Sequence, residues 1–368
     1  MNFQLEILSN PEVFLPSIFK TKKDSYQHSK TKSELFYIHN RRFLGNKFKL
    51  LDFIEEIVFN NCNEINTFCD VFAGTGVVGE RFNKKNIKII ANDILASNYI
   101  PLKTFLGINK IDYHSVKNKI DFLNHLDPEN DNYFSENFGD TYFTMVNARK
   151  IGAIREKIND IGATEKPILI TSLLYAVDKV ANTVGHYDAY RKVLDTTQPL
   201  KLLIPFINSE NNNNNEVYQE DANKLIKRIS CDVLYIDPPY NSRQYSDAYH
   251  LLENLVTWQK PPLKGKAKKM DRSHIKSEYC LKSASLAFND LISNANCKYI
   301  LVSYNNTGES KHSRSNARIN DEQIINILKT RGEVKIFERE YKAFTTGKSE
   351  SDGHTERVFY CKVTKKRI

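Results

Sequence analysis

No run of apolar residues in this sequence is long enough to cross a membrane. The longest strongly apolar stretch covers about residues 167–177, whereas a membrane-spanning helix needs roughly 18 such residues. The first residues, MNFQLEILSNPEVF, do not form a basic leader followed by a continuous apolar block, so we expect no secretory signal. Both absences predict a protein of the cytoplasm that does not contact a membrane.

Cysteine is sparse, and its spacing excludes common metal and redox sites. The six cysteines are Cys62, Cys69, Cys231, Cys280, Cys297 and Cys361. No two of them have C-x-x-C spacing, so the sequence indicates neither a zinc site nor a redox pair. We also find no carboxylate cluster typical of a nuclease metal site. The scattered cysteines therefore predict reduced thiols and a protein without a bound metal.

What the chain does have is an excess of positive charge. It contains 53 lysines and arginines against 44 acidic residues, which gives a net charge of +9 and a pI of about 9.0. Hydrophobic residues make up 40% of the 368 residues and charged residues 26%, as in globular proteins. The length predicts a main domain with an inserted or appended second one. The charge suits a protein that binds a polyanion.

Periodicity predicts the opening of a doubly wound α/β sheet. Residues 1–35 are polar with weak periodicity, and a helical stripe of apolar residues follows over 46–59. A short β-like run at 67–72 ends in a glycine-bearing turn, and a second one at 87–91 ends at Asn92 and Asp93. This order of strand, turn, helix and strand is typical of a parallel sheet covered by helices.

The alternation then breaks, which predicts a helical insertion. Between about 103 and 215 helical periodicity is clearest at 151–161 and 168–180, and the polar tract 211–215 has the composition of a surface loop. Strand-like runs resume later, with a final antiparallel pair expected; they cover 233–236, 299–304, 333–340 and 357–363. We therefore expect an N-terminal extension at 1–35, a catalytic domain at 36–102 and 216–368, and an inserted domain at 103–215.

The stretch Asp70-Val71-Phe72-Ala73-Gly74-Thr75-Gly76 has the character of a cofactor-binding turn. Glycines allow a tight turn at the carboxyl end of a strand and a close approach of the ligand. Asp93 follows the next strand, where a carboxylate can accept the hydroxyls of a ribose. NAD and S-adenosylmethionine both fit this pattern, because A-G-T-G-V-V-G can also be read as a dinucleotide turn.

A second motif, Asp237-Pro238-Pro239-Tyr240, decides between these cofactors. It ends a buried-looking strand, and each proline fixes φ near −65°, so an acid and a carbonyl are held rigidly above the strand end. The Asp237 carboxylate and the Pro238 carbonyl can hold both N–H bonds of an exocyclic amine and align its lone pair toward a methyl donor. The ring of Tyr240 can stack on a base removed from the helix. The motif predicts methyl transfer to a base.

The motifs and their order resemble the Dam-like class of adenine-specific DNA methyltransferases, in the subset that often accompanies type II restriction systems. The matching segments, in chain order, are Arg42-Phe43-Leu44-Gly45-Asn46-Lys47, Phe72-Ala73-Gly74-Thr75-Gly76, Asn92-Asp93, Glu220-Asp221-Ala222, Asp237-Pro238-Pro239-Tyr240 and Ser303-Tyr304-Asn305. The first departs from the family form, because Phe43 stands where a tryptophan is usual. The resemblance implies a Rossmann-like methyltransferase sheet with a largely helical inserted target-recognition region.

The resemblance also implies the cofactor, the partners and the roles of individual residues. The cofactor is S-adenosyl-L-methionine, and the partners are double-stranded DNA and a restriction endonuclease acting on the same site. The residues implied to bind the cofactor are Phe43, Lys47, Asp70, Phe72, Gly74, Gly76, Asp93 and Asp221. Among these, Asp93 meets the ribose and Asp221 the adenine amino group. Asp237 lies where cofactor and substrate meet, and the catalytic set is Asp237, Pro238, Pro239 and Tyr240.

Several basic segments are candidates for holding DNA. The segment 260–276 carries seven lysines or arginines against one acid, a composition that suits contacts to phosphates; the candidates there are Lys264, Lys266, Lys268 and Lys269. Arg243 follows the catalytic motif and could fill the gap left by a flipped base or clamp a phosphate. The segment 182–191 of the insertion and the turn 341–356 are further candidates.

Three other functions compete with DNA adenine methylation. Ribosomal RNA adenine methyltransferases tend to have Asn where Asp237 stands and lack so large an insertion, and cytosine-amino methyltransferases tend to have Ser there. A non-catalytic DNA-binding relative would have no reason to retain Gly74, Gly76, Asp93 and the whole catalytic motif. We therefore expect an S-adenosylmethionine-dependent enzyme that methylates the amino group of an adenine flipped out of duplex DNA.

Overall fold

The computed structural model describes residues 34–162, 164–195, 198–240, 242–306, 319–340 and 355–365. The chain divides into two units, Met1–Leu35 and Phe36–Ile368, and the second carries the elements that build the site. Its central sheet has seven strands in the order β5-β3-β2-β6-β7-β9-β8. They are β2 (Thr67–Asp70), β3 (Lys88–Asn92), β5 (Glu216–Tyr218), β6 (Cys231–Ile236), β7 (Cys297–Asn306), β8 (Gly332–Glu340) and β9 (Thr355–Val363).

The sheet reverses its winding between β2 and β6. From β2 the chain runs outward through β3 to β5, then returns to place β6 on the other side of β2; these pairs are parallel, as is β6 with β7. Strand β9 runs antiparallel between β7 and β8, which confirms the antiparallel pair expected from 333–340 and 357–363. Ligands bind at such a reversal, beyond the carboxyl ends of the strands. The predicted doubly wound α/β fold is confirmed.

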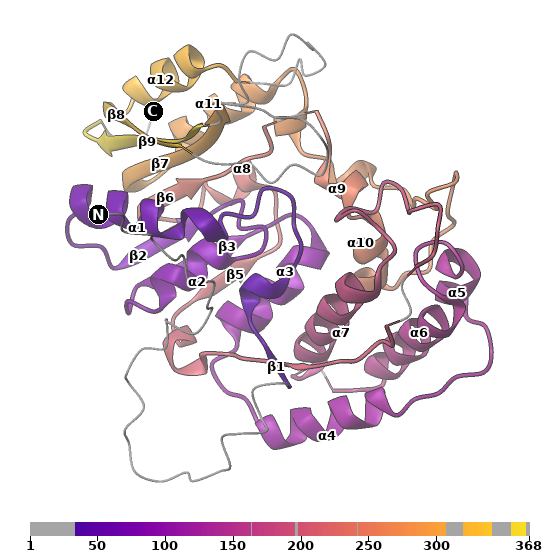
Figure 1. The fold of residues 1–368 in the computed structure, drawn as a ribbon. Coiled ribbons are helices and arrows are strands. Elements are labelled where there is room, and N and C mark those ends of the chain that lie inside the picture. Colours follow the sequence, from indigo (N-terminus) through magenta and orange to yellow (C-terminus); the bar gives the residue numbers. More distant parts are fainter. Residues whose placement is uncertain are drawn as a thin grey trace, which may run out of the picture. The chain divides into compact units, whose positions relative to one another are not determined.

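Helices cover both faces of this sheet (Figure 1). On one face lie α1 (Leu51–Asn61), α2 (Val77–Asn83) and α3 (Ala96–Leu102), and on the other α8 (Ala222–Leu225), α11 (Ala284–Asn294) and α12 (Asp321–Lys329). The rings of Phe68 from β2 and Phe82 from α2 are fully buried and stack at 4.1 Å between centroids. On the opposite face Phe288 of α11 is equally buried. Strands buried on both faces explain the nearly continuous apolar runs in the sequence.

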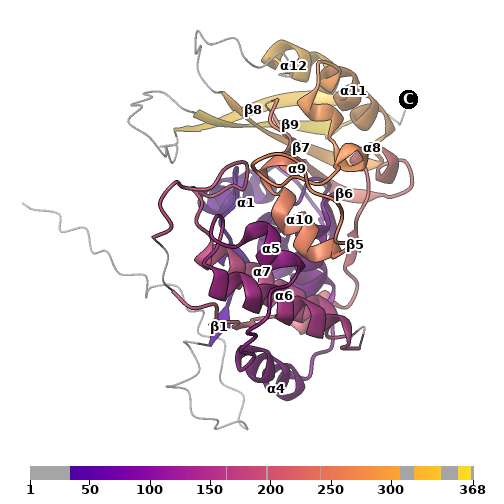
Figure 2. The same ribbon diagram turned by 90° about the vertical axis from the view of Figure 1, so that its right-hand side faces the viewer.

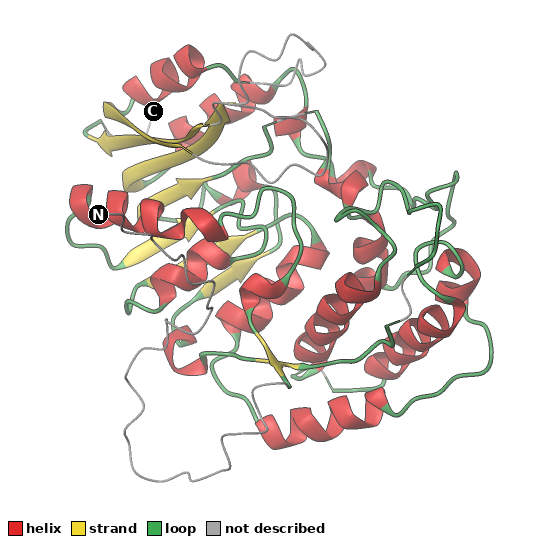
Figure 3. Ribbon diagram, in the orientation of Figure 1, coloured by secondary structure: helices red, strands yellow, loops and turns green. Residues whose placement is uncertain are grey.

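A group of helices lies between β3 and β5 in the chain and beside the sheet in space (Figures 2 and 3). They are α4 (Tyr113–Asn124), α5 (Tyr133–Phe138), α6 (Met145–Asn159) and α7 (Lys166–Val180). The helices expected at 151–161 and 168–180 are thus confirmed in α6 and α7. Helix α10 (His250–Thr257) packs against this group, since buried Arg155 of α6 donates to the carbonyls of Leu255 and Val256 at 2.8 and 2.9 Å.

The remaining elements are short. They comprise the strands β1 (Leu35–Phe36) and β4 (Ile204–Pro205), the helix α9 (Tyr245–Ala248), the 3-10 helices η2 (Ile38–Asn40), η3 (Phe48–Leu50), η5 (Ser209–Asn212), η6 (Ser273–Ile275) and η7 (Glu278–Cys280), and the π-helical turn η4 (Lys103–Gly107). The periodicity analysis missed β5, because three residues are too few to show a strand period.

The asparagine tract 211–215 is only in part the surface loop that its composition predicted, because Asn213 and Asn214 are exposed in a turn but Asn212 is buried. Asn212 is buried and donates to the carbonyls of Phe105 and Ile108, at 2.9 and 2.8 Å. Asn215 accepts from the Ile89 amide at 2.7 Å and donates to a neighbouring carbonyl at 3.0 Å. These amides satisfy backbone groups exposed where η4 ends and where β3 begins, and buried polar groups need such partners. The tract therefore anchors the start of β5.

The described residues contain neither a candidate membrane span nor a candidate metal site. In the described ranges, no helix is both long enough and apolar enough to cross a membrane. Among the described side chains there is no group of three or more His, Cys, Asp or Glu residues that could hold a metal ion. All six cysteines are free thiols, and five of them are buried.

Replacing Gly76 with alanine is expected to destabilise the fold by about 2 kcal/mol or more. Gly76 precedes α2 with φ +81°, and an added Cβ would lie 2.5 Å from Cδ2 of Leu102. The substitution therefore combines backbone strain with a clash in the core. Thermal or urea unfolding measures the loss. Gly162→Ala is the control, because nothing lies within 4 Å of its Cβ position; equal stability losses for both variants would contradict the packing argument.

Candidate active site

A cavity opens at the carboxyl ends of β2, β3 and β6, where the sheet reverses its winding. It holds about 1000 Å³ of space between atoms, part of it open to solvent. The residues predicted from the sequence that line it are Phe43, Lys47, Asp70, Phe72, Gly74, Asp93, Asp221, Asp237, Pro238, Pro239 and Tyr240. Gly76 does not line it but forms the base of the turn, donating its amide to the Ala73 carbonyl at 2.7 Å. The fold thus brings residues almost 200 positions apart into one site.

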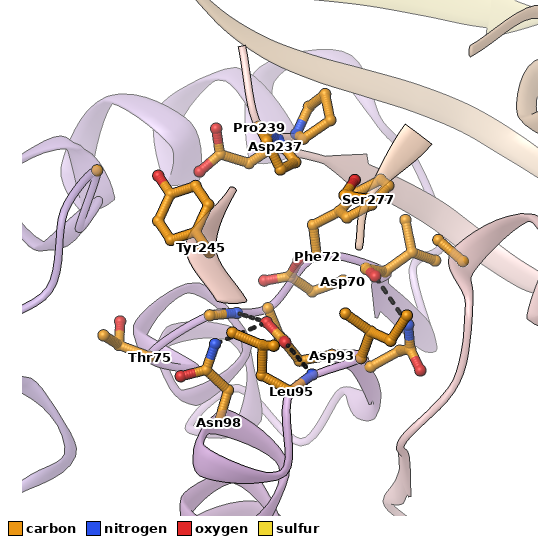
Figure 4. Close-up of a pocket in the computed structure, with 18 of the residues that line it drawn as sticks. Asp70, Phe72, Thr75, Asp93, Leu95, Asn98, Asp237, Pro239, Tyr245 and Ser277 are labelled. Atoms are coloured by element: carbon orange, nitrogen blue, oxygen red, sulfur yellow. Dashed lines mark hydrogen bonds between the residues drawn. The ribbon is translucent and has the colours of Figure 1, made fainter. Parts of the chain in front are cut away.

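Asp70, the last residue of β2, is a buried acid facing this cavity (Figure 4). Its Oδ1 atom has no hydrogen-bond partner among the described residues. Burial, together with the charge of nearby Asp237, raises the pKa of Asp70 well above its usual range, although the Phe72 amide and Lys47 act in the opposite direction. A buried acceptor without a partner is costly, so this atom is suited to a donor on a bound ligand.

The glycine turn lets an aromatic side chain close over the cavity. Gly74 has φ +52°, and a Cβ there would lie 3.3 Å from the Phe43 ring. Phe43 in turn stacks on Tyr249 and Tyr245, with centroids 4.6 and 5.3 Å apart. Phe72 also lines the cavity and meets Tyr279 edge to face at 4.9 Å. The site therefore has flat apolar walls, which suit a planar ligand such as a purine.

The Asp93 carboxylate stabilises the glycine turn and uses most of its acceptor positions to do so. Its carboxylate accepts from the amides of Gly74 and Leu95 and from the Asn98 side chain, at 2.9–3.0 Å (Figure 4). Burial nonetheless raises its pKa to about 6. A carboxylate offers about four acceptor positions, so three are used within the protein. Room remains for one further hydroxyl donor.

Asp221 has a structural role at the start of α8 and also lies in the cavity lining. Its side chain accepts from the Lys224 amide at 3.1 Å and so caps the N-terminus of α8. It also lines the cavity, as does Glu220, whose amide donates to the Asn92 side chain at 3.0 Å. The cap fixes the carboxylate in the cavity lining.

The centre of the site is an ion pair between Lys47 and Asp237. Lys47 Nζ lies 3.1 Å from Asp237 Oδ1, and the lysine side chain is only 5% exposed. Burial raises the pKa of Asp237 to about 6; Lys47 opposes this rise, and the charge of Glu356 from β9 adds to it. The pKa of Lys47 lies well above its usual value: burial opposes this rise, and the charges of Asp237 and Glu356, with those of two neighbouring tyrosines, together outweigh it. At neutral pH the pair is ionised.

Tyr240 stands beside this pair. Its ring lies 5.8 Å from Lys47 Nζ and meets Tyr304 of β7 edge to face at 5.9 Å. Tyr304 is itself fixed, since its hydroxyl accepts from the Ile319 amide at 3.0 Å. Tyr304 belongs to the late segment singled out in the sequence, and its contact explains that segment's place in the site. The Tyr240 ring is thus held at the cavity wall, half-buried.

Sequence reasoning missed the residues that support the predicted ones. Arg41 is buried and donates to the Ser97 carbonyl and the Asn98 side chain at 2.9 Å. Tyr245 donates to the Leu44 carbonyl, and Tyr249 accepts from the Leu44 amide, at 3.2 and 2.7 Å. The i, i+4 spacing of these two tyrosines, just after the catalytic motif, was the available signal. No pattern pointed to Arg41.

The candidate DNA-binding residues lie outside the cavity lining. Lys264, Lys266 and Lys268 are exposed on a tight turn, closed by paired backbone hydrogen bonds between Lys264 and Lys269 at 2.8 and 3.0 Å. Arg243 and Lys269 converge on an acid of the segment 182–191. Asn241 and most of the candidate turn 341–356 lie outside the described residues.

Comparisons with known proteins identify the family of this chain. A family profile described as D12 class N6 adenine-specific DNA methyltransferase matches residues 43–319. The chain is 36% identical to the type II methyltransferase M.FokI of Planomicrobium okeanokoites over 87% of its own length and 52% of the relative. It is 33% identical to the type II methyltransferase M.NlaIII of Neisseria lactamica over 85% and 95%, and 34% identical to the modification methylase StsI of Streptococcus sanguinis over 78% and 46%.

The chain thus spans about half the length of M.FokI and StsI and nearly all of M.NlaIII. The profile covers the segment from Phe43 to Ile319, which includes the glycine turn, Asp93, the helical insertion and the Asp237–Tyr240 motif. This chain therefore belongs to the D12 class of N6 adenine-specific DNA methyltransferases, enzymes that use S-adenosyl-L-methionine.

Proposed function

We propose that the chain methylates the exocyclic amino group of an adenine flipped out of double-stranded DNA, at a specific site. We further propose that it is the modification enzyme of a type II restriction system, acting in the cytoplasm beside an endonuclease of the same specificity. The observation that carries the first proposal is the buried Lys47–Asp237 pair at the end of β6. It faces a cavity whose lining also holds an acceptor without a partner among the described residues, Asp70 Oδ1.

The residues of the β2 side fit S-adenosylmethionine. Asp70 Oδ1 would accept from its ammonium group, which would satisfy that buried atom. The Phe43 wall would cover its adenine, and the remaining acceptor position of Asp93 suits one ribose hydroxyl. Asp221, held by its hydrogen bond from the Lys224 amide, would accept from the adenine amino group. The bound cofactor supplies a methyl group already activated by its sulfonium.

The β6 side would align the substrate amine. The Asp237 carboxylate and the Pro238 carbonyl would each accept one N–H bond of the adenine amine, which directs its lone pair across the cavity. Lys47 keeps Asp237 ionised, so the carboxylate remains an acceptor at neutral pH and can later take the proton that the methylated amine releases. Catalysis would therefore come from alignment and fixed charge.

Replacing Tyr240 with alanine is expected to slow methylation by about 5- to 150-fold, because a base stacked on an aromatic ring gains roughly 1–3 kcal/mol. Tyr240→Phe should retain most of the activity, since the phenyl ring still stacks and still meets Tyr304. Single-turnover methylation of a duplex with one target adenine measures both variants. If alanine were as active as phenylalanine, Tyr240 would not stack on the base.

Methylation of DNA by the purified chain tests the proposed function. DNA lacking adenine methylation is incubated with the chain and methyl-labelled S-adenosylmethionine, digested to nucleosides and separated. Label in N6-methyladenine is expected, with sequencing showing one sequence context for the modified bases. Label in cytosine, or no label on any DNA although the chain binds the cofactor, would contradict the proposal.

A further inference from the structure

Asp188, in the loop between α7 and β4, meets basic side chains from two distant segments and one from its own loop. Lys269 Nζ lies 2.7 Å from its Oδ1, Arg243 Nε lies 3.6 Å from its Oδ2, and His186 Nδ1 lies 3.8 Å from the same oxygen. Arg243 comes from the segment after the catalytic motif and Lys269 from the basic segment 260–276. We call these four residues the Asp188 cluster.

The fold fixes Asp188 through its neighbour Tyr187. The Tyr187 ring is only 2% exposed, and its hydroxyl donates to Asp178 at 2.8 Å. Its carbonyl accepts from the Tyr142 hydroxyl and is paired with His250 Nε2, both at 2.8 Å. Its amide donates to the Ala248 carbonyl at 2.7 Å. With every polar group of Tyr187 engaged, the backbone that carries Asp188 is held rigidly.

The basic segment is fixed against the same loop. The Tyr142 hydroxyl, which binds the Tyr187 carbonyl, also lies 3.3 Å from the carbonyl of Ala267. At the end of the turn, Arg272 pairs with Asp247 of α9 at 2.7 Å. Lys269 is half-buried in this arrangement. The contact between Lys269 and Asp188 therefore joins two anchored backbones and is not a pair of loose surface side chains.

The charges of the Asp188 cluster do not cancel. Burial acts to raise the pKa of Asp188, but the hydrogen bond from Lys269 and the charges of Lys269 and Arg243 hold that pKa below its usual value. Burial and Arg243 lower the pKa of His186, so His186 is neutral at pH 7. Two cations facing one carboxylate leave an excess of one positive charge, which favours a phosphate.

The position of the cluster links it to base extrusion. Arg243 is three residues beyond Tyr240, and the next residue, Gln244, lines the cavity. A guanidinium has five N–H donors in a fixed fork, and the Asp188 contact engages its Nε edge. An arginine oriented in this way can present a fork to a phosphate.

We propose that Asp188 is a positioning residue, which holds Arg243 and Lys269 as a two-cation clamp for the phosphodiester backbone beside an extruded nucleotide. The proposal rests on the proposed function and adds to it the residue that sets the geometry of the DNA contact. It also predicts that loss of the Asp188 charge affects DNA affinity and methylation rate in different ways. An acid in the interface opposes DNA binding, whereas an acid that orients the clamp assists methylation.

Asp188→Asn tests this separation. On a duplex with a normally paired target adenine, single-turnover methylation should slow about tenfold or more, because a misplaced clamp raises the barrier to extrusion. DNA affinity, measured at several salt concentrations, should stay equal or become tighter. On a duplex whose target adenine faces an abasic site, the loss of rate should shrink to less than about threefold, because that base needs no help to leave the stack.

Matched variants complete the test. Asp188→Glu should recover much of the rate, and Asp195→Asn should leave it unchanged, since Asp195 is an exposed acid of the same loop paired only with Arg191 at 3.7 Å among the described residues. Lys269→Met should slow methylation of paired DNA and, unlike Asp188→Asn, weaken binding. Unchanged methylation of paired DNA by Asp188→Asn, or an equal loss on both duplexes, would overturn the inference. Failure of the unaltered chain to methylate any DNA would instead overturn the proposed function.

Discussion

Asp237→Ala is expected to abolish methyl transfer, with a rate at least about a thousandfold below that of the unaltered chain. The substitution removes the acceptor that would align the amine and leaves Lys47 buried opposite an apolar side chain. Single-turnover methylation at saturating cofactor and DNA measures the loss. Binding of S-adenosylmethionine and of DNA should persist, because the Phe43 wall, Asp70 and the basic segment are untouched.

Asp237→Asn is the matched control for this prediction. The asparagine side chain keeps the shape and one acceptor oxygen, but it carries no charge and cannot take the proton released by the methylated amine. We expect a loss of about 10- to 100-fold, between alanine and the unaltered chain. Alanine and asparagine variants with equal, nearly full activity would show that the amine is aligned elsewhere in the cavity.

The sequence was sufficient for the motifs and for every strand of the central sheet except β5, because their signals are local. The apolar runs that became β2, β3, β6 and β7 are buried on both faces, and the Asp237 motif is rigid whatever surrounds it. The sequence did not show which side chains distant in the chain pair in space. Nothing in the sequence joins Lys47 to Asp237 across the long stretch of chain between them.

The sequence analysis was less accurate for polar segments, whose composition suggested exposure to solvent. The asparagine tract 211–215 is polar, yet its amides satisfy buried backbone groups at the start of β5. Asp188 is a single acid in a polar loop, and only the folded chain shows that Lys269 and Arg243 meet it. Polar residues obtain their roles from partners distant in the chain, so local patterns do not distinguish a buried ligand from a solvated one.

Lys47→Met is expected to move the pH dependence of methylation upward. In the unaltered chain the pKa of Asp237 is about 6, so activity should rise as pH increases through about 6 and level off above about 7.

Lys47 lowers the pKa of Asp237, while burial and Glu356 raise it. Without the lysine, burial and Glu356 still raise the pKa of Asp237. More of this carboxyl is therefore protonated at neutral pH. We expect a large loss of rate at about pH 7 that is partly recovered at about pH 8.5–9. The methylation rate of the variant, measured against pH beside that of the unaltered chain, checks this expectation.

Stability should respond to pH with the opposite sign. A carboxyl whose pKa is higher in the folded than in the unfolded chain contributes stability below its unfolded pKa, near about 3.9, and that contribution is lost as pH rises through the folded pKa. For Asp237 the window ends at about pH 6, and in Lys47→Met it extends further upward. Melting temperatures of the variant should therefore fall, relative to the unaltered chain, over the pH range in which its activity rises. A variant in which activity and stability both rose across this range would show that Lys47 does not act through the ionisation of Asp237.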